Sequence, residues 1–251
     1  MNVIVDGLLI NYREVGNKTA KPVIFLHGWA DQSSSFDGLA GGLSAEYRCI
    51  MVDLPGFGSS QAPPEAWDIP DFSNLVSAFL NKIKVKPYAL AGHSNGGAIA
   101  IKAVAEGKVK PKKLILLASS GLRGRQKFKK TVYKALAKPA KAGLALLPKY
   151  KREAIKRKLY GSIGSDYMVS GHMKETFKKI VSYDVSADAG KIDIPVLLVY
   201  GSDDTYTPPE FGAHFRGMIK GSELEIIEGA GHFVHQENSA KTTALIRGFL
   251  K

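Results

Sequence analysis

The chain has 251 residues, 45% of them hydrophobic, which is enough for one α/β domain with a full core and a modest insertion, and too short for two independent domains. No run approaches the roughly 20 consecutive apolar residues of a membrane-spanning helix. Residues 1–7 lack the features of a secretory signal, so we expect a soluble, cytoplasmic protein. Cys49 is the only cysteine and lies in an apolar run, which excludes an internal disulfide and predicts a buried, non-catalytic thiol.

The positive charge is concentrated in one internal segment. The whole chain has a net charge of +12. Residues 119–184 contain 17 Lys or Arg against 4 Asp or Glu, a net of +13, whereas the remainder has 18 basic and 19 acidic residues. The basic character therefore belongs to this segment and not to the protein as a whole.

A hairpin and a series of buried strands are expected along the chain. Residues 3–10 and 11–15, with Asp6 and Gly7 between or near them, resemble an antiparallel hairpin at a sheet edge. Short apolar runs closed by Gly, Asp or Ser follow, and such runs are typical of strands buried on both faces of a parallel sheet. They lie within residues 21–28, 49–54, 88–91, 114–118, 195–200 and 224–227.

Helices are expected between these runs. One apolar face of a helix has the spacing i, i+3, i+4, i+7, i+8 and i+11. It is formed by Phe72, Leu75, Val76, Phe79, Leu80 and Ile83. Asp71 is placed to cap the amino terminus of this helix. Strands that alternate with helices predict an α/β fold with a mostly parallel sheet and helices on both faces.

The alternation stops at residues 121–184, which contain no buried-strand run and are rich in Lys, Ala and Leu. We expect helices outside the sheet here, divided into at least three pieces by Pro139 and Pro148. The predicted organisation is a core of residues 1–118 and 190–251 with a helical insertion of residues 119–189.

A GxSxG pattern centred on Ser94 stands between an apolar strand and an apolar helix. A serine at the apex of a tight strand-to-helix turn exposes its hydroxyl, and small flanking residues let the strand and helix approach closely. An ordinary glycine-rich turn is the alternative, but the type of both flanking elements argues against it. Ser94 is therefore the candidate nucleophile.

A serine nucleophile needs a base, and His232 is the best of six histidines. It follows the run at residues 224–227, and the small residues before it let its loop approach the turn that bears Ser94. His235 is the competitor, expected to start the last helix. Four further histidines are assigned to turns around the site or to partly polar helical surfaces: His27, His93, His172 and His214.

The base needs a carboxylate to fix its tautomer, and the strand at residues 195–200 ends near two candidates, Asp203 and Asp204. The chain order serine, aspartate, histidine is the order expected of a nucleophile-elbow hydrolase. Both carboxylates remain possible on this reasoning.

These motifs resemble the α/β-hydrolase superfamily over essentially the whole chain. A family pattern of Gly, two residues, Asp and a Pro four residues further on aligns with Gly201, Asp204 and Pro208. The resemblance therefore implies Asp204 as the acid, with Asp203 as a minor alternative. It also implies the α/β-hydrolase fold, with residues 119–189 as a small helical cap that walls the substrate pocket.

The resemblance further implies an oxyanion hole formed by the backbone N–H groups of Asn95, after the nucleophile, and Trp29, in an HGx motif. The Trp29 indole is also expected as a pocket wall. Trp29, His93 and Phe233 are the expected substrate contacts. Residues 53–60 resemble a second family signature, a sharp turn that supports the oxyanion loop.

The implied function is a carboxylic ester hydrolase that works through an acyl-enzyme. Three alternatives remain open: a C–C bond hydrolase of diketone ring-fission products, an esterase of carrier-protein-linked methyl esters, and a non-catalytic binding protein on the same fold. Dehalogenase and epoxide hydrolase activities are disfavoured, because those relatives have an aspartate where this chain has Ser94. No phosphate loop, dinucleotide fingerprint or metal-ligand cluster is apparent, so no cofactor and no metal are expected.

The densest basic cluster of the insertion admits two interpretations. It consists of Lys151, Arg152, Lys156, Arg157 and Lys158. An amphipathic helix there would bind an acidic partner, such as a carrier protein, or a membrane surface. A solvated face that keeps the protein soluble is at least as good an interpretation. Nucleic acid binding is not expected, since no recognised reader motif accompanies the charge.

Overall fold

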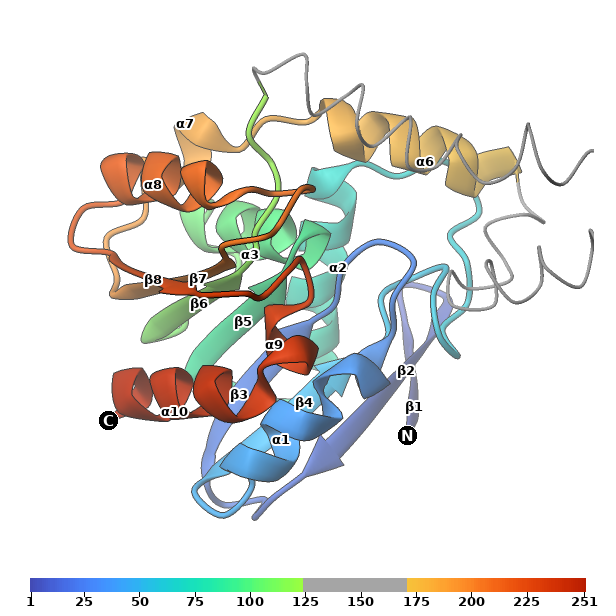
Figure 1. Ribbon diagram of the computed structural model, residues 1–251. Helices are drawn as coiled ribbons and strands as arrows, with labels where there is room; N and C mark the ends of the chain where they lie inside the picture. The colour runs from blue at the N-terminus through green and yellow to red at the C-terminus, as the bar shows by residue number, and fades with distance from the viewer. Residues whose placement is uncertain (124–170) are drawn as a thin grey trace, which may run out of the picture.

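The computed structural model describes residues 1–123 and 171–251. Within them lies one sheet of eight strands in the order β1-β2-β4-β3-β5-β6-β7-β8 (Figure 1). The strands are β1 Asn2–Val5, β2 Leu8–Val15, β3 Lys21–Leu26, β4 Tyr47–Val52, β5 Ala89–His93, β6 Lys113–Leu117, β7 Val196–Gly201 and β8 Glu223–Ile227. β2 pairs antiparallel with β1 and β4, and the other neighbours pair parallel. The predicted mostly parallel sheet is confirmed.

The apolar runs form the strands for the expected reason. Every residue of β5 and of β7 is buried, as both faces of these central strands are covered. β8 is one of the two edge strands, and its Glu223 and Glu225 are exposed, which keeps that edge charged. Cys49 is fully buried in β4, and burial raises the pKa of its thiol to about 12.

The amino-terminal hairpin turns earlier than predicted. β1 ends at Val5 and β2 begins at Leu8, so residues 3–10 are not one strand. Asp6 and Gly7 have φ of 47° and 82°, the left-handed backbone that two-residue hairpin turns require. Asp and Gly tolerate this backbone best, which is why the chain reverses here.

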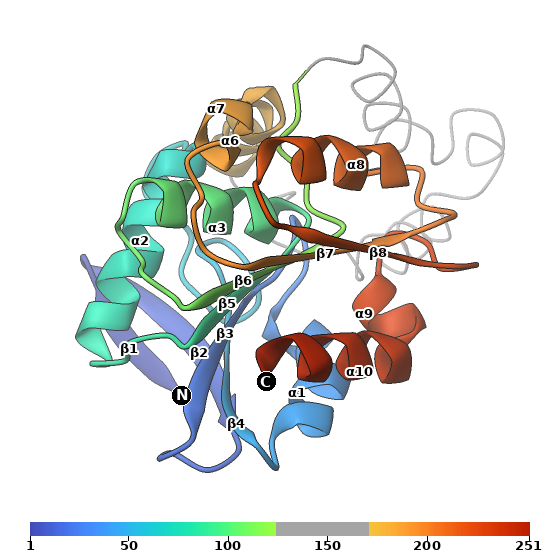
Figure 2. The same cartoon turned by 90° about the vertical axis from the view of Figure 1, so that its left-hand side faces the viewer.

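Helices cover both faces of the sheet, as Figure 2 shows. One face packs against α1 (Asp37–Leu43), with the preceding 3-10 turn η1 (Ser33–Phe36), and α10 (Ser239–Leu250). The other face packs against α2 (Ile69–Lys82), α3 (Asn95–Ala105) and α8 (Pro209–Met218). None of the helices in residues 1–123 and 171–251 is long and apolar enough to cross a bilayer.

The cap of α2 differs from the sequence prediction. The helix begins at Ile69, and its N-cap is Asp68, whose side chain accepts the Asp71 backbone N–H. Asp71 is the third helical residue, and its carboxylate accepts the Asp68 N–H in return at 2.8 Å. This reciprocal capping box satisfies two backbone donors at once. The prediction was wrong by three residues because Pro70 is tolerated inside the first helical turn.

The described end of the predicted insertion is helical. It forms α6 (Gly171–Ser182) and α7 (Ser186–Ala189). Helix α6 is fastened to the core by the Trp67 N–H, which donates to Thr176 Oγ1 at 3.0 Å, and by Lys179 Nζ, which donates to the Ala66 carbonyl. The predicted divisions at Pro139 and Pro148 and the basic cluster lie outside the described residues. That cluster comprises Lys151, Arg152, Lys156, Arg157 and Lys158.

Candidate active site

Ser94 occupies the turn between β5 and α3 in a strained conformation, with φ of 50° and ψ of −114°. Its N–H donates to the Leu117 carbonyl at 3.0 Å, and its carbonyl accepts the N–H groups of Gly97 and Ser120, both at 3.0 Å. A non-glycine residue keeps such a backbone only where its surroundings fix it. The strain and the backbone bonds hold Ser94 at the apex of the turn.

Two glycines make this turn possible. A β carbon at Gly92 would lie 2.4 Å from the Gly96 carbonyl oxygen, and one at Gly96 would lie 2.1 Å from that of Leu26. Real β carbons do not approach backbone this closely, so strand β5, helix α3 and strand β3 meet only because neither residue has a side chain. Both positions of the GxSxG pattern therefore require glycine for steric reasons.

Ser94, His232 and Asp204 form a continuous hydrogen-bonded chain. His232 Nε2 lies 3.0 Å from Ser94 Oγ, and His232 Nδ1 lies 2.8 Å from Asp204 Oδ2. The side chains of His232 and Asp204 are 11% and 0% exposed. A carboxylate can only accept, so Nδ1 carries the hydrogen and the Nε2 lone pair faces the Ser94 hydroxyl. This arrangement can take a proton from the hydroxyl and return it to a leaving group.

Of the two candidate carboxylates, Asp204 reaches the imidazole. Asp203 is exposed and accepts the Ser202 hydroxyl at 2.9 Å instead. Asp204 Oδ1 accepts the backbone N–H groups of Tyr206 at 2.7 Å and Thr207 at 3.0 Å. These two bonds leave Oδ2 directed to His232, so the turn after β7 orients the acid.

Thr207 is a neighbour of this chain that sequence reasoning missed. Its Oγ1 lies 2.8 Å from Asp204 Oδ2, 3.1 Å from His232 Nδ1 and 2.9 Å from the Ala118 carbonyl. Thr207 is 1% exposed, so its hydroxyl shields the Asp204 and His232 pair from water. No spacing in the sequence identified this contact.

Glu237, also missed, holds the loop that carries His232. Its Oε2 accepts the Gly231 N–H at 2.6 Å and its Oε1 accepts the Phe233 N–H at 3.0 Å, on either side of His232. Glu237 ends the short helix α9 (Val234–Glu237), which brings its carboxylate back to the loop. The signal in the sequence is a Glu one helical turn after a glycine-rich loop.

Residues 53–60 support the loop after β3. The buried His27 donates from Nδ1 to the Gly28 carbonyl at 2.7 Å, and its Nε2 accepts the Leu54 N–H at 2.9 Å. Burial lowers the pKa of His27, which keeps this neutral tautomer. Asp53 accepts the Ser33 N–H at 2.7 Å and the Ser59 N–H at 2.9 Å. Together these bonds hold the loop at residues 27–33 against the turn at residues 53–60.

The two expected oxyanion donors lie beside Ser94. Asn95 is the next residue and begins α3. Trp29 follows Gly28, and a β carbon at Gly28 would lie 3.2 Å from Ser94 Cβ. The Trp29 indole packs against Phe57 and Phe177, with ring centroids 4.8 and 5.1 Å apart. Phe177 belongs to α6, so the insertion reaches the loop that carries Trp29.

The three expected substrate contacts differ in access. Phe233 is 39% exposed and Tyr206 is 40% exposed, and their ring centroids lie 5.4 Å and 5.2 Å from that of His232. Trp29 is partly buried. His93 is 1% exposed, and its Nε2 donates to the His232 carbonyl at 3.0 Å. The expectation that His93 contacts substrate is therefore corrected, because its imidazole lies beneath the site.

The remaining histidines bear on the choice of base. His235 was expected to start the last helix, but it lies in α9, and α10 begins at Ser239. His235 is 1% exposed and is packed against His93, with ring centroids 4.4 Å apart. His172 and His214 are exposed, as their polar surroundings indicated.

The described residues also contain one group of three side chains that could hold a metal ion, namely Asp31, His93 and His235. Sequence reasoning expected no such cluster. The three residues are far apart in the chain and come together only through the fold, so no metal-binding motif in the sequence predicts them.

The chain resembles known hydrolases in sequence and in structure. The model of the alpha/beta hydrolase family matches residues 23–245. A pimeloyl-[acyl-carrier protein] methyl ester esterase from Neisseria meningitidis serogroup C is 28% identical over 245 residues, covering 92% of this chain and 94% of that protein.

Solved structures share the fold. A membrane phospholipase A, described as a bacterial virulence factor, superposes with a TM-score of 0.83 at 22% identity and covers 100% of this chain and 84% of that one. The enol-lactonase of Burkholderia xenovorans LB400 superposes with a TM-score of 0.78 at 20% identity, with 100% and 99% covered. At these identities the likeness establishes the architecture alone. With its family model matching most of the sequence, the chain belongs to the alpha/beta hydrolase family.

Proposed function

We propose that the protein hydrolyses carboxylic esters through an acyl-enzyme formed on Ser94. The observation that carries the proposal is the hydrogen-bonded chain in which His232 Nε2 lies 3.0 Å from Ser94 Oγ and His232 Nδ1 lies 2.8 Å from Asp204 Oδ2. A serine hydroxyl is a weak nucleophile, and a histidine held in one tautomer by a buried carboxylate activates it.

In the first half-reaction, Ser94 Oγ forms a bond to the ester carbonyl carbon while His232 Nε2 takes the hydroxyl proton. Asp204 stabilises the resulting imidazolium without accepting its proton. The tetrahedral intermediate collapses when the bond to the alcohol oxygen breaks, and His232 gives its proton to that oxygen. The alcohol leaves and the acyl group stays on Ser94.

In the second half-reaction, His232 takes a proton from water, which attacks the acyl carbon. The bond to Ser94 Oγ then breaks, His232 returns the proton to Ser94, and the carboxylic acid is released. We assign the developing negative charge of both intermediates to the backbone N–H groups of Trp29 and Asn95. Exposed aromatic rings of Tyr206 and Phe233 beside His232 favour apolar ester substrates.

A panel of p-nitrophenyl esters of graded acyl length tests this proposal. We expect the wild-type protein to turn over at least one of them, and Ser94→Ala to lose activity by about 10⁵-fold or more with the fold intact. Ser34→Ala is the matched control, because Ser34 is an exposed serine outside the site. Wild-type rates in folded Ser94→Ala, judged by circular dichroism, would contradict the assignment.

A second candidate is a methyl ester carried on an acidic acyl-carrier protein. Two observations favour it: the 28% identical relative is named for that reaction, and residues 119–184 carry a net charge of +13. Complementary charge speeds and strengthens association and is screened by salt.

The test compares hydrolysis of a methyl ester on a carrier protein with that of the free methyl ester. We expect the carrier-linked ester to have the lower KM at low salt, with the advantage lost at high salt and in a variant with Lys156, Arg157 and Lys158 changed to Gln. Equal KM values for the two esters at low salt would sink this candidate and leave the general esterase proposal untouched.

A further inference from the structure

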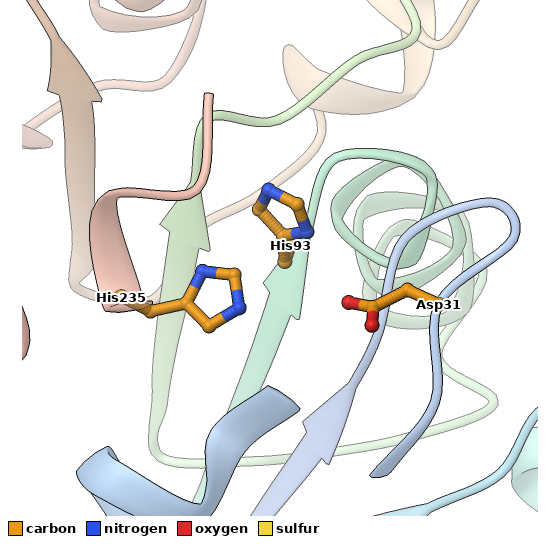
Figure 3. Close-up of side chains that lie close together, drawn as sticks. All are labelled: Asp31, His93 and His235. Carbon is orange, nitrogen blue, oxygen red and sulfur yellow. The ribbon is translucent and has the colours of Figure 1, made fainter. Parts of the chain in front are cut away.

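We propose that Asp31, His93 and His235 form a site for a divalent transition metal ion of the zinc class, next to the serine site but distinct from it. One carboxylate oxygen and one nitrogen of each imidazole lie within 4.8 Å of one another. Figure 3 shows the three side chains pointing toward one another from three elements: the loop after β3, the end of β5 and helix α9.

Each of the three side chains has one buried polar atom without a hydrogen-bond partner among the described residues. Within residues 1–123 and 171–251, no hydrogen-bond partner is found for His93 Nδ1, His235 Nδ1 or Asp31 Oδ2. Both imidazoles are 1% exposed. Buried polar atoms are almost always paired, so an unpaired atom on each of three side chains that lie close together indicates a ligand held by this cluster.

The tautomer of His93 suits a metal. His93 Nε2 donates its hydrogen to the His232 carbonyl at 3.0 Å, so Nδ1 carries a lone pair. A histidine that binds a metal commonly donates its other ring N–H to a carbonyl in this way. A neutral imidazole with a free ring nitrogen is the form that coordinates metals.

The donor set selects the kind of ion. Two imidazoles and one carboxylate suit zinc and its transition-metal neighbours, whereas calcium and magnesium prefer oxygen ligands throughout. Zinc at about 2.1 Å from each ligand places tetrahedral ligand atoms about 3.4 Å apart, so the three donors must draw together on binding. Asp31 lies in a loop and is partly exposed, so we assign this adjustment to it.

The position of the site implies a stabilising role. His93 directly precedes Ser94, and His235 follows His232 by three residues, so a bound ion would fasten the nucleophile turn to the histidine loop. Binding to the folded state alone raises its stability by mass action. The inference is independent of the ester reaction, since its readouts are binding and stability.

The experiment is calorimetric titration of the chelator-stripped full chain with Zn²⁺, together with the visible absorption of Co²⁺ and the change in Tm. We expect one ion per chain and a rise in Tm. Asp31→Asn and His235→Phe should each weaken binding by more than about 10-fold, the loss that even an outer partner of a metal ligand causes. The phenyl ring can pack as His235 does against Phe36, at 4.9 Å between ring centroids.

Controls separate this site from others on the protein. The double variant His172→Ala with His214→Ala and the variant His232→Ala should bind Zn²⁺ as the wild type does, and Ca²⁺ and Mg²⁺ should not bind. Absence of 1:1 binding, or unchanged binding in folded Asp31→Asn or His235→Phe, would overturn the proposal and leave a bridging water as the partner of these atoms.

Discussion

The turn that carries Ser94 and the loop that carries His232 are held in place by different means. The serine turn is fixed by backbone contacts so close that Gly92 and Gly96 can have no side chain. The histidine loop is fixed by side chains: Glu237 holds the N–H groups on both sides of His232, and His93 donates to its carbonyl. Substitutions in the first region should therefore damage the fold, and those in the second should damage activity.

Among the substitutions outside Ser94 itself, the largest effect is expected at the acid that orients His232. Asp204→Asn should lower kcat by about 10⁴-fold while the protein stays folded, because the amide cannot hold the imidazole in the required tautomer as a carboxylate does. Asp203→Asn is the matched neighbour and should retain near wild-type activity. Steady-state kinetics on one p-nitrophenyl ester measures both; a large loss in Asp203→Asn alone would reverse the assignment of the acid.

A methyl group added to the serine turn should destabilise the fold more than one added to the histidine loop. Gly96→Ala places a β carbon 2.1 Å from the Leu26 carbonyl oxygen, whereas Gly231→Ala places one 3.2 Å from the flexible Glu237 carboxylate. We expect Gly96→Ala to lower the free energy of unfolding by about 3 kcal/mol and Gly231→Ala by less than about 1 kcal/mol. Urea denaturation followed by circular dichroism gives both values, and equal losses would remove the contrast.

Acid should lower the stability of the folded protein, because His235 is buried as a neutral imidazole. In the unfolded chain His235 takes up a proton below its ordinary pKa of 6.5, whereas burial lowers its pKa in the folded protein to about 3. Between these values the unfolded state binds more protons, so the free energy of unfolding falls as the pH is lowered, by about 2 kcal/mol at pH 5 for this one group.

His235→Phe removes this contribution to the pH dependence of stability. Its loss of stability between pH 7.5 and pH 5, measured in chelator by urea denaturation, should be smaller than that of the wild type by about 2 kcal/mol. His214→Ala, which changes an exposed histidine, should follow the wild-type curve. Parallel curves for His235→Phe and the wild type would show that His235 is not held neutral.

The smallest effect is expected at Glu237. Glu237→Gln replaces one of the two oxygens that accept the N–H groups of Gly231 and Phe233, so the histidine loop loses one of its two bonds to Glu237. We expect kcat to fall by about 10-fold with little change in KM, since one hydrogen bond contributes about 1 kcal/mol to holding His232. A change in KM alone would indicate that Glu237 acts on substrate access instead.

Much of the fold followed from local pattern. The buried strands were predictable because both faces of a parallel sheet are covered, which makes each strand a continuous apolar run. The errors fell where backbone detail decides the outcome. Asp6 and Gly7 turn the chain before residue 8, and the capping pair Asp68 and Asp71 starts α2 earlier than its apolar face does.

The site also contains residues that the sequence predicted and residues that it did not. Ser94, His232 and Asp204 each follow a strand, and their order in the chain is set by the fold, so sequence reasoning could propose them together. Thr207 and Glu237 act through distances that no spacing specifies. The cluster of Asp31, His93 and His235 is assembled wholly by tertiary packing. The extent of the cap over residues 119–189 stays a prediction.

The most direct test of the proposed chemistry is labelling with a fluorophosphonate, which reacts with an activated serine, followed by peptide mass spectrometry. We expect a single adduct on the peptide that contains Ser94, strongly reduced in His232→Ala, while Ser94→Ala is not labelled. Labelling of another serine, or equal labelling of Ser94 in His232→Ala, would contradict the assignment of His232 as the base that activates Ser94.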